Sequence, residues 1–321
     1  MNRLLNLIQN ENMKIYRRIR TWILLGVLVT LSVVVVYFIH RSASNQPSNA
    51  EWKAQLQQEI AFSKENLARM NEEKLANKQF KQRLEKDIKI NEYRLENNLP
   101  PHEKSVWSYV LSLSQLISLV TVFTTIIAAD IVAAEFAGGT IKLLLIRPAS
   151  RTKILLSKYL ATLGFSILLL ITLFLTAFLA AGLFTGFENA GEPYIYASND
   201  LVVHESGMFI HAINTYALEC VQLVMIVTLA FMISAVFRSS SLAIGISLIA
   251  MFIGAGITAL IQKYSWAKYY LFANTDLTQY LNGQPFQDDM TMGFSIAVLI
   301  GYFVIFNALS WWVFTKRDVA A

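Results

Sequence analysis

The sequence predicts an all-α integral membrane protein with six transmembrane helices. Hydrophobic residues make up 55% of the 321-residue chain and charged residues only 15%, an apolar excess beyond the usage of soluble domains. Six apolar runs approach the length of about 20 residues that crosses a bilayer as a helix. A helix satisfies its own backbone hydrogen bonds, so it is the expected spanning structure.

The six predicted spans are separated by polar or charged segments. They cover residues 22–39, 106–129, 159–187, 216–237, 242–261 and 293–314. The third span is long enough to tilt or to project beyond the bilayer. Only Arg238–Ser241 separates the fourth span from the fifth, which predicts a tight antiparallel pair.

The distribution of lysine and arginine predicts the orientation of these spans. Among the short segments, basic residues concentrate in 1–21, 130–158 and 315–321, and Arg238 lies between the fourth and fifth spans. The long segment 40–105 also holds many lysines, but long loops cross the membrane despite their charge. By contrast, the loop 188–215 has no lysine or arginine and the loop 262–292 has two. The positive-inside rule therefore places both termini in the cytoplasm, which agrees with an even number of spans. The first span is expected to stay uncleaved, because Ala43–Asn45 is a poor signal-peptide cleavage site.

The segment 1–21 before the first span is amphipathic. Its leucines and isoleucines share a broad face, with arginine and lysine elsewhere. This pattern favours a helix that lies in the inner interface of the bilayer. The alternative is a basic flank that only sets the topology.

The segment 40–105 between the first two spans is expected outside the membrane as a helical hairpin. Residues 48–99 contain no glycine or proline, and apolar residues recur at helical spacing. They are Trp52, Leu56, Ile60, Leu67, Phe80, Leu84, Ile88 and Leu95. Both ends must return to the membrane, so a turn near Met70–Asn77 is expected. The hairpin is either a solvated spacer or a surface that binds a partner or substrate.

Motifs for catalysis and cofactor binding are absent from the sequence. It has no P-loop, no Gly-x-Ser-x-Gly elbow and no His-Glu-x-x-His, and we expect neither catalytic, cofactor-binding nor metal-binding residues. A single cysteine, Cys220, excludes an intrachain disulfide. The basic residues form no separate domain, so nucleic-acid binding is not expected.

Two acidic residues stand out within or beside the apolar runs. Glu219 lies inside the fourth span, where an ionisable residue is a candidate for a substrate or ion role, here the translocation path. It could also reach the outer headgroups or pair with a neighbour. Asp130 ends the second span and is expected to pair with a nearby arginine or lysine.

The loop 130–158 is too basic to cross the bilayer and too apolar to be an idle connection. Gly138–Gly139 breaks its first helical part, and Ser150 is a plausible N-cap for the run into the third span. The apolar residues 143–146 cannot all face water. They are expected to lie in the membrane interface or against another protein.

The residues of this loop resemble those of the permeases of type-2 ATP-binding-cassette (ABC-2) transporters. The resemblance rests on Glu135-Phe136, Gly139-Thr140-Ile141-Lys142-Leu143-Leu144, Arg147-Pro148-x-Ser150-Arg151 and Lys158. It extends to the six spans, the N-terminal amphipathic helix and the basic C-terminal end. The hairpin 40–105 is a departure, since minimal members of that family lack it.

The resemblance implies a dimeric permease, as a homodimer or heterodimer, in contact with membrane lipids and driven by a separate ATPase subunit. ATP would bind to that partner, so this chain needs no cofactor and is not itself an enzyme. The residues that would couple to the ATPase are Glu135, Phe136, Gly139, Thr140, Ile141, Lys142, Leu144 and Arg147. The expected cargo is amphipathic, such as a lipid, antibiotic or peptide, exported across a bacterial plasma membrane.

Other functions remain open from the sequence. Within transport they are import or sodium-linked efflux. A different class is a membrane sensor or scaffold whose outside hairpin binds a ligand or protein. The fifth span also carries small residues at Ala250, Gly254 and Thr258, a spacing that allows close helix packing either within one subunit or at a dimer seam.

Overall fold

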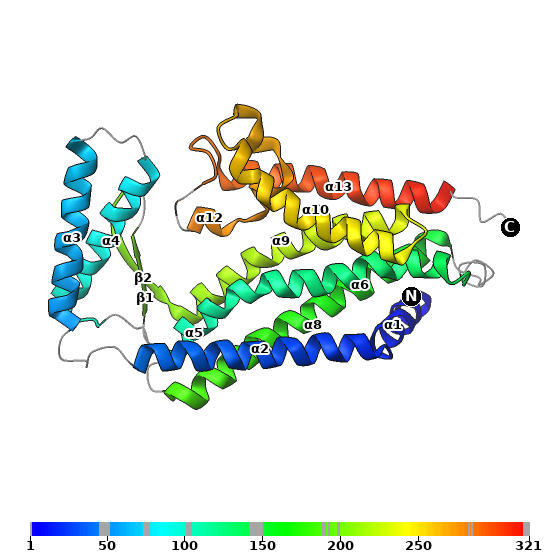
Figure 1. Cartoon of the computed structure of the whole chain (residues 1–321), viewed down its shortest axis with the longest axis horizontal. Helices are drawn as coiled ribbons and strands as arrows, with labels where there is room; N and C mark the ends of the chain where they lie inside the picture. The colour runs from blue at the N-terminus through cyan, green and yellow to red at the C-terminus, as the bar shows by residue number, and fades with distance from the viewer. Residues whose placement is uncertain are drawn as a thin grey trace.

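The structure is a computed structural model of the whole chain. It describes residues 2–44, 52–72, 78–100, 105–140, 150–187, 191, 193–197, 200–281, 283 and 285–316. Helices dominate these residues, and the chain forms an elongated bundle with a smaller lobe at one end (Figure 1).

Six helical segments are long and apolar enough to span a membrane, and each overlaps one predicted span. They are α2 (Ile19–Ser44), α5 to α6 (Val106–Leu113 and Ile117–Ala137, joined by the 3-10 turn η1, Ser114–Leu116), α8 (Arg151–Thr185), α9 (Met208–Val236), α10 (Ser240–Ile261) and α13 (Met292–Lys316). The chain is therefore a multi-pass, predominantly α-helical membrane protein. At 1.5 Å per residue the 35 residues of α8 reach about 52 Å, well beyond a hydrocarbon core of about 30 Å.

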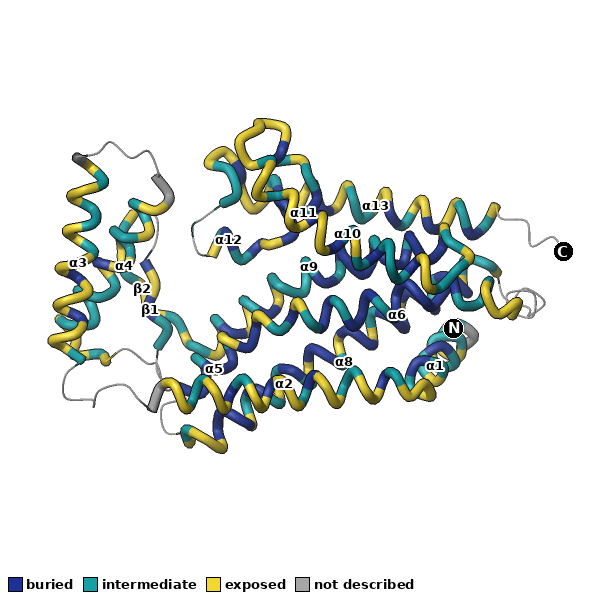
Figure 2. Tube along the Cα trace, viewed as in Figure 1, coloured by how far each residue is buried: buried dark blue, intermediate teal, exposed yellow. Residues whose placement is uncertain are grey.

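The core of the bundle lies around α6, which packs against α8, α9 and α10 (Figure 2). Its span is 72% buried over its most apolar window, against 17% for α2, α10 and α13. At the centre, the Ser234 hydroxyl of α9 accepts hydrogen bonds from the backbone N–H groups of Val132 and Ala133, both at 3.1 Å. The outer faces of α2, α10 and α13 are apolar and exposed, as expected for surfaces that meet lipid or another subunit.

Two of the helices extend beyond the spans that the sequence predicts. Helix α6 continues to Ala137 instead of ending at residue 129, and α8 begins at Arg151 instead of residue 159. Ser150 is the N-cap of α8, as predicted, and its hydroxyl accepts a hydrogen bond from the Lys153 N–H at 3.4 Å. The connection between the two helices therefore covers only residues 138–150. Both helices can extend into the charged segment because their charged side chains are paired inside the protein.

The N-terminal helix is present as α1 (Asn2–Tyr16). A turn at Arg17 and Arg18 separates it from α2, and α1 packs along the start of α8. Ile15 is buried in the main core, and the Tyr16 ring contacts Phe165 edge to face with centroids 6.3 Å apart. This helix is thus held by protein contacts on one side, in addition to any contact with the bilayer surface.

The segment between the first two spans contains two helices, α3 (Trp52–Glu72) and α4 (Lys78–Glu96), which pack against each other. Leu56 and Ile60 of α3 and Ile88 of α4 are buried. Lys64 and Glu92 join the two helices by an ion pair of 2.8 Å. Phe80, which the apolar spacing places in the interface, is 46% exposed instead. The predicted turn region falls partly on 73–77, outside the described residues.

The loop before α9 departs from the all-α prediction. Two short strands, β1 (Pro193–Ala197) and β2 (Val203–Gly207), form an antiparallel hairpin, with Pro193 opposite Gly207 and Ala197 opposite Val203. Helix α9 starts at Met208, eight positions before the predicted residue 216. The β-hairpin contacts α4 and the start of α9, and Tyr93 of α4 donates a hydrogen bond to Glu205 at 3.1 Å.

Between α10 and α13 the chain folds into the 3-10 turn η2 (Ser265–Tyr269) and two short helices, α11 (Leu271–Thr275) and α12 (Thr278–Leu281). The Phe272 ring of α11 lies directly against Gly254, where a Cβ would overlap the ring. The Tyr270 hydroxyl also donates to the Gly254 carbonyl at 3.0 Å. Of the two alternatives for the small residues of this span, packing within one subunit is therefore the one observed at Gly254.

Candidate functional site: a charged cluster joining α1, α6 and α8

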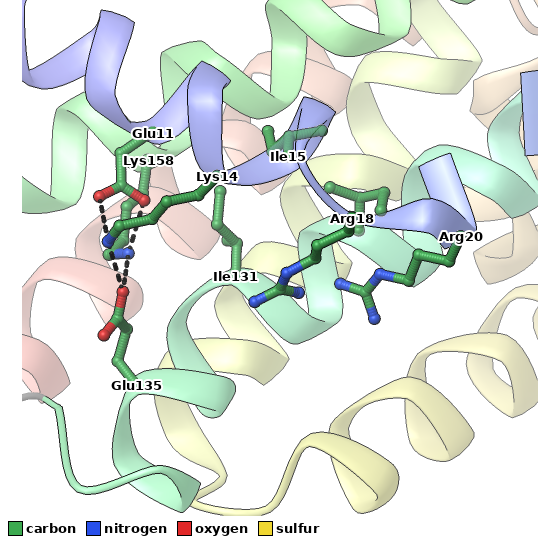
Figure 3. Close-up of a pocket in the computed structure, with 9 residues that line it drawn as sticks. Glu11, Lys14, Ile15, Arg18, Arg20, Ile131, Glu135 and Lys158 are labelled. Atoms are coloured by element: carbon green, nitrogen blue, oxygen red, sulfur yellow. Dashed lines mark hydrogen bonds and ion pairs between the residues drawn. The ribbon is translucent and has the colours of Figure 1, made fainter. Parts of the chain in front are cut away.

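Four charged side chains from three helices meet at one end of the bundle (Figure 3). Lys158 of α8 is 1% exposed and donates to Glu11 of α1 at 2.8 Å and to Glu135 of α6 at 3.0 Å. Lys14 of α1 donates to the same two carboxylates at 2.8 and 2.7 Å. We call Glu11, Lys14, Glu135 and Lys158 the charged quartet.

The quartet is electrically balanced, with two ammonium groups and two carboxylates. This balance matters because an unpaired charge in a buried site is costly, whereas one that is paired and fully hydrogen-bonded can be tolerated. At Lys14, burial lowers the pKa, but hydrogen bonds to Glu11 and Glu135 outweigh it and raise the pKa above its ordinary value. Lys14 is therefore held in its charged form.

A second ion-pair group lies beside the quartet. Asp130 of α6 is 4% exposed and accepts hydrogen bonds from Arg18 and Arg20, which flank the start of α2. The predicted pairing of Asp130 with a nearby basic residue is confirmed. Together the two groups fasten both sides of the turn between α1 and α2 to α6.

The two groups line a small pocket of about 20 Å³, enough for about one water molecule. Its apolar wall includes Ile15, Ile127 and Ile131. The pocket is too small for an amphipathic substrate. We therefore interpret the two ion-pair groups as contacts that hold the helices together.

The described part of the predicted coupling segment lies at the end of α6 and just beyond it. Glu135 and Phe136 are in the last turn of α6, where the Phe136 ring meets Phe314 of α13 edge to face, with centroids 6.5 Å apart. Gly139 has a φ of +68°, a conformation that favours glycine and turns the chain away from α6. The exposed Thr140 donates its hydroxyl to the Glu135 carboxylate.

The remaining predicted coupling residues, Ile141, Lys142, Leu144 and Arg147, lie outside the described residues. Glu135 was predicted to meet the ATPase, and that contact stays a prediction. Within this chain its carboxylate already binds Lys14, Lys158 and Thr140, so its first role is to hold α1 against α6 and α8.

Glu219 lies apart from this cluster, on the part of α9 that faces α11 and α12. It is half-buried, and its charged neighbour is Asp276, another carboxylate, in the connection between α11 and α12. No ion pair joins Glu219 to a basic residue in the part of the chain that the structure describes. Across the same described residues, no group of histidine, cysteine and acidic side chains has the arrangement of a metal site.

The sequence prediction missed Glu11, which binds both lysines of the quartet. One signal could have found it, because Glu11 is the only acidic residue among the first 50 residues and lies three positions before Lys14. An acidic residue on a basic, amphipathic helix is expected to pair with a cationic side chain. The identity of that partner, Lys158, depends on tertiary packing.

Comparison with known proteins gives one family and two relatives. The family model described as "Protein of unknown function (DUF2705)" matches residues 85–320. The chain is 43% identical over 321 residues to "Uncharacterized protein YhcI" of Bacillus subtilis (strain 168), covering 99% of this chain and all of that protein. It is 34% identical over 215 residues to "Uncharacterized membrane protein YdbK" of the same organism, covering 66% of this chain and 81% of that protein. The description of YdbK as a membrane protein agrees with the spans found here.

Proposed function

The chain belongs to the DUF2705 family, and we propose that it is the permease subunit of an ATP-binding-cassette exporter of amphipathic cargo. It would act as a dimer in the cell membrane and bind a separate ATPase subunit that carries the ATP. The proposal rests first on the resemblance of residues 135–158 to the coupling segment of such permeases.

The observation that carries the proposal is the position of the charged quartet around the connection 138–150. Glu135 lies just before this connection and Lys158 lies about two turns of α8 after its end. Both side chains bind the same two residues of α1. A force that a soluble partner applies to the connection would therefore move α1, α6 and α8 together. A permease driven by a separate ATPase requires such a coupled movement of its helices.

We further propose that both termini and the connection 138–150 face the cytoplasm, and that α3, α4 and the β-hairpin lie outside. The distribution of basic residues supports this orientation. In addition, α1 and the last turns of α13 lie at one end of the bundle and the α3–α4 hairpin at the other (Figure 1).

Cysteine labelling tests this orientation. In a Cys220→Ser background, single cysteines at Arg69 and Asp200 should react with a membrane-impermeant maleimide in intact cells. Cysteines at Thr140 and Ser241 should react only after the cells are opened. Labelling of the Thr140 position in intact cells would overturn the proposed topology.

The ATPase partnership is tested first by asking whether a neighbouring gene encodes a soluble P-loop ATPase, and then by co-expressing the chain with that ATPase. The two chains should co-purify, and the complex should hydrolyse ATP. Leu144→Asp should reduce co-purification and transport-linked ATP turnover at least about 10-fold, because a carboxylate enters an apolar joint. Membrane insertion and dimer formation should be unchanged.

A matched control is Val202→Asp, which makes the same kind of change at a residue that is 53% exposed at the other end of the molecule. It should keep full association with the ATPase. Full association of Leu144→Asp would remove the main support for the permease function. Absence of any ATPase partner would favour the sensor or scaffold alternative.

A further inference from the structure

A second, larger pocket lies at the opposite end of the molecule from the charged quartet. It has a volume of about 280 Å³, close to the lower end of the range of roughly 300–1,000 Å³ for small-molecule sites. Helix α4, strand β1 and the end of α12 supply its described lining: Arg83, Lys86, Asp87, Ile90, Tyr194, Tyr196, Ala197 and Leu281.

One wall of this pocket is aromatic. Tyr194 and Tyr196 are two positions apart on β1, so they project from the same face of the strand, and their rings stack with centroids 5.9 Å apart. The imidazole of His211 stacks on Tyr194 at 3.5 Å, and Tyr196 packs against His204 of β2 at 5.5 Å. These four rings pack against one another, so contacts within this chain form the aromatic wall.

The facing wall is polar and carries a net positive charge. Arg83 and Lys86 supply two cations from α4, and Asp87 supplies one carboxylate. The Arg83 side chain is 62% exposed and pairs with Asp87 only at 4.0 Å, too long for a strong hydrogen bond, so its guanidinium can bind another anion. The Tyr194 hydroxyl is protonated at neutral pH and can donate a hydrogen bond; burial raises its pKa further above the ordinary value.

The three remaining lining residues are apolar: Ile90, Ala197 and Leu281. Ile90 of α4 is half-buried, and Leu281 of α12 is 48% exposed. The pocket therefore combines a flat aromatic surface, an apolar part and a cationic part. Because Leu281 belongs to a different region from α4 and β1, a molecule bound here would also join the hairpin lobe to the segment between α10 and α13.

We propose that this pocket binds a small organic anion, a phosphate or carboxylate carried on a flat or apolar body. The anionic group would pair with Arg83 and Lys86, and the body would stack on Tyr196 and contact Leu281. The anion could come from a soluble compound or from a lipid headgroup. This inference does not depend on transport, since binding requires only this chain.

The test uses the full chain in nanodiscs of phosphatidylcholine, with phenyl phosphate as the probe and calorimetry as the measurement. Phenyl phosphate should bind saturably, and inorganic phosphate should bind about 10-fold more weakly because it lacks a ring to stack. Arg83→Gln should weaken phenyl phosphate binding about 10-fold, since a hydrogen bond to a charged group is lost. Tyr196→Leu should weaken phenyl phosphate but not inorganic phosphate.

The matched control is Lys53→Gln, which removes one positive charge from the exposed face of α3, outside the pocket. It should leave binding unchanged. Repeating the titration in nanodiscs that contain phosphatidylglycerol separates the two sources: competition supports a lipid headgroup, and unchanged binding supports a soluble anion. No saturable binding, or equal losses in Arg83→Gln and Lys53→Gln, would overturn the proposal.

Discussion

Replacing Lys158 by methionine is expected to lower the free energy of unfolding by about 3–5 kcal/mol, because it removes one partner from a buried ion-pair group. Methionine keeps most of the length of the side chain but no charge. Glu11 and Glu135 would then share only Lys14, and the buried site would hold one uncompensated negative charge. Helix α1 should detach first, since two of the four residues of the quartet belong to it.

The measurement is thermal unfolding in detergent, together with hydrogen exchange of the α1 amides. Lys153→Met is the matched control, because Lys153 lies on the same helix but is exposed. Its effect should stay within about 0.5 kcal/mol. The double variant Glu11→Met, Lys158→Met restores the charge balance and should recover most of the loss. A single variant as stable as the double variant would show that the quartet does not hold α1.

Replacing Gly254 by leucine is expected to be the largest single effect at the other end of the bundle, about 1–3 kcal/mol of destabilisation. The new side chain would occupy the place of the Phe272 ring. That ring packs against a second, smaller hydrophobic cluster, which includes Leu271 and Leu277. Displacement of α11 would also break the hydrogen bond from Tyr270 to the Gly254 carbonyl.

Gly256→Leu provides the control for this change. Gly256 lies on the same helix, and no atom comes within 4 Å of a Cβ built there. This variant should be neutral or gain up to about 1 kcal/mol from the better helix propensity of leucine. Thermal unfolding of the two variants under the same conditions compares their melting temperatures. Equal melting temperatures would mean that the contact of Gly254 with Phe272 does not contribute to stability.

The six spans can be predicted from the sequence because each contains an uninterrupted apolar window, and hydropathy responds to that property alone. Their ends cannot be predicted in the same way. Asp130, Glu135 and Lys158 mark the limits of the apolar runs, yet all three lie within continuous helices. Their charges are tolerated there because they are neutralised by Lys14 and Glu11 of α1, Arg18 of the turn and Arg20 of α2.

The β-hairpin was missed although its residues carry a strand pattern. Tyr194, Ile195 and Tyr196 are aromatic or β-branched, and asparagine and aspartate at 199 and 200 are residue types typical of turns. The whole segment 188–215 was predicted to be a loop because it lies between two long apolar runs. The charged quartet was missed for a different reason, because its pairs join residues 121 and 147 positions apart, and no local pattern reveals such partners.

This separation along the chain has a consequence for synthesis in the cell. When α1 leaves the ribosome, Glu11 and Lys14 have each other but neither Glu135 nor Lys158. At about 5–20 residues per second, Lys158 is made roughly 7–30 s after Glu11. During that interval the amphipathic helix α1 can bind only to the bilayer surface. Docking of α1 is therefore a late event in biogenesis, and a nascent chain stalled before α8 should present this helix to membrane-associated proteases.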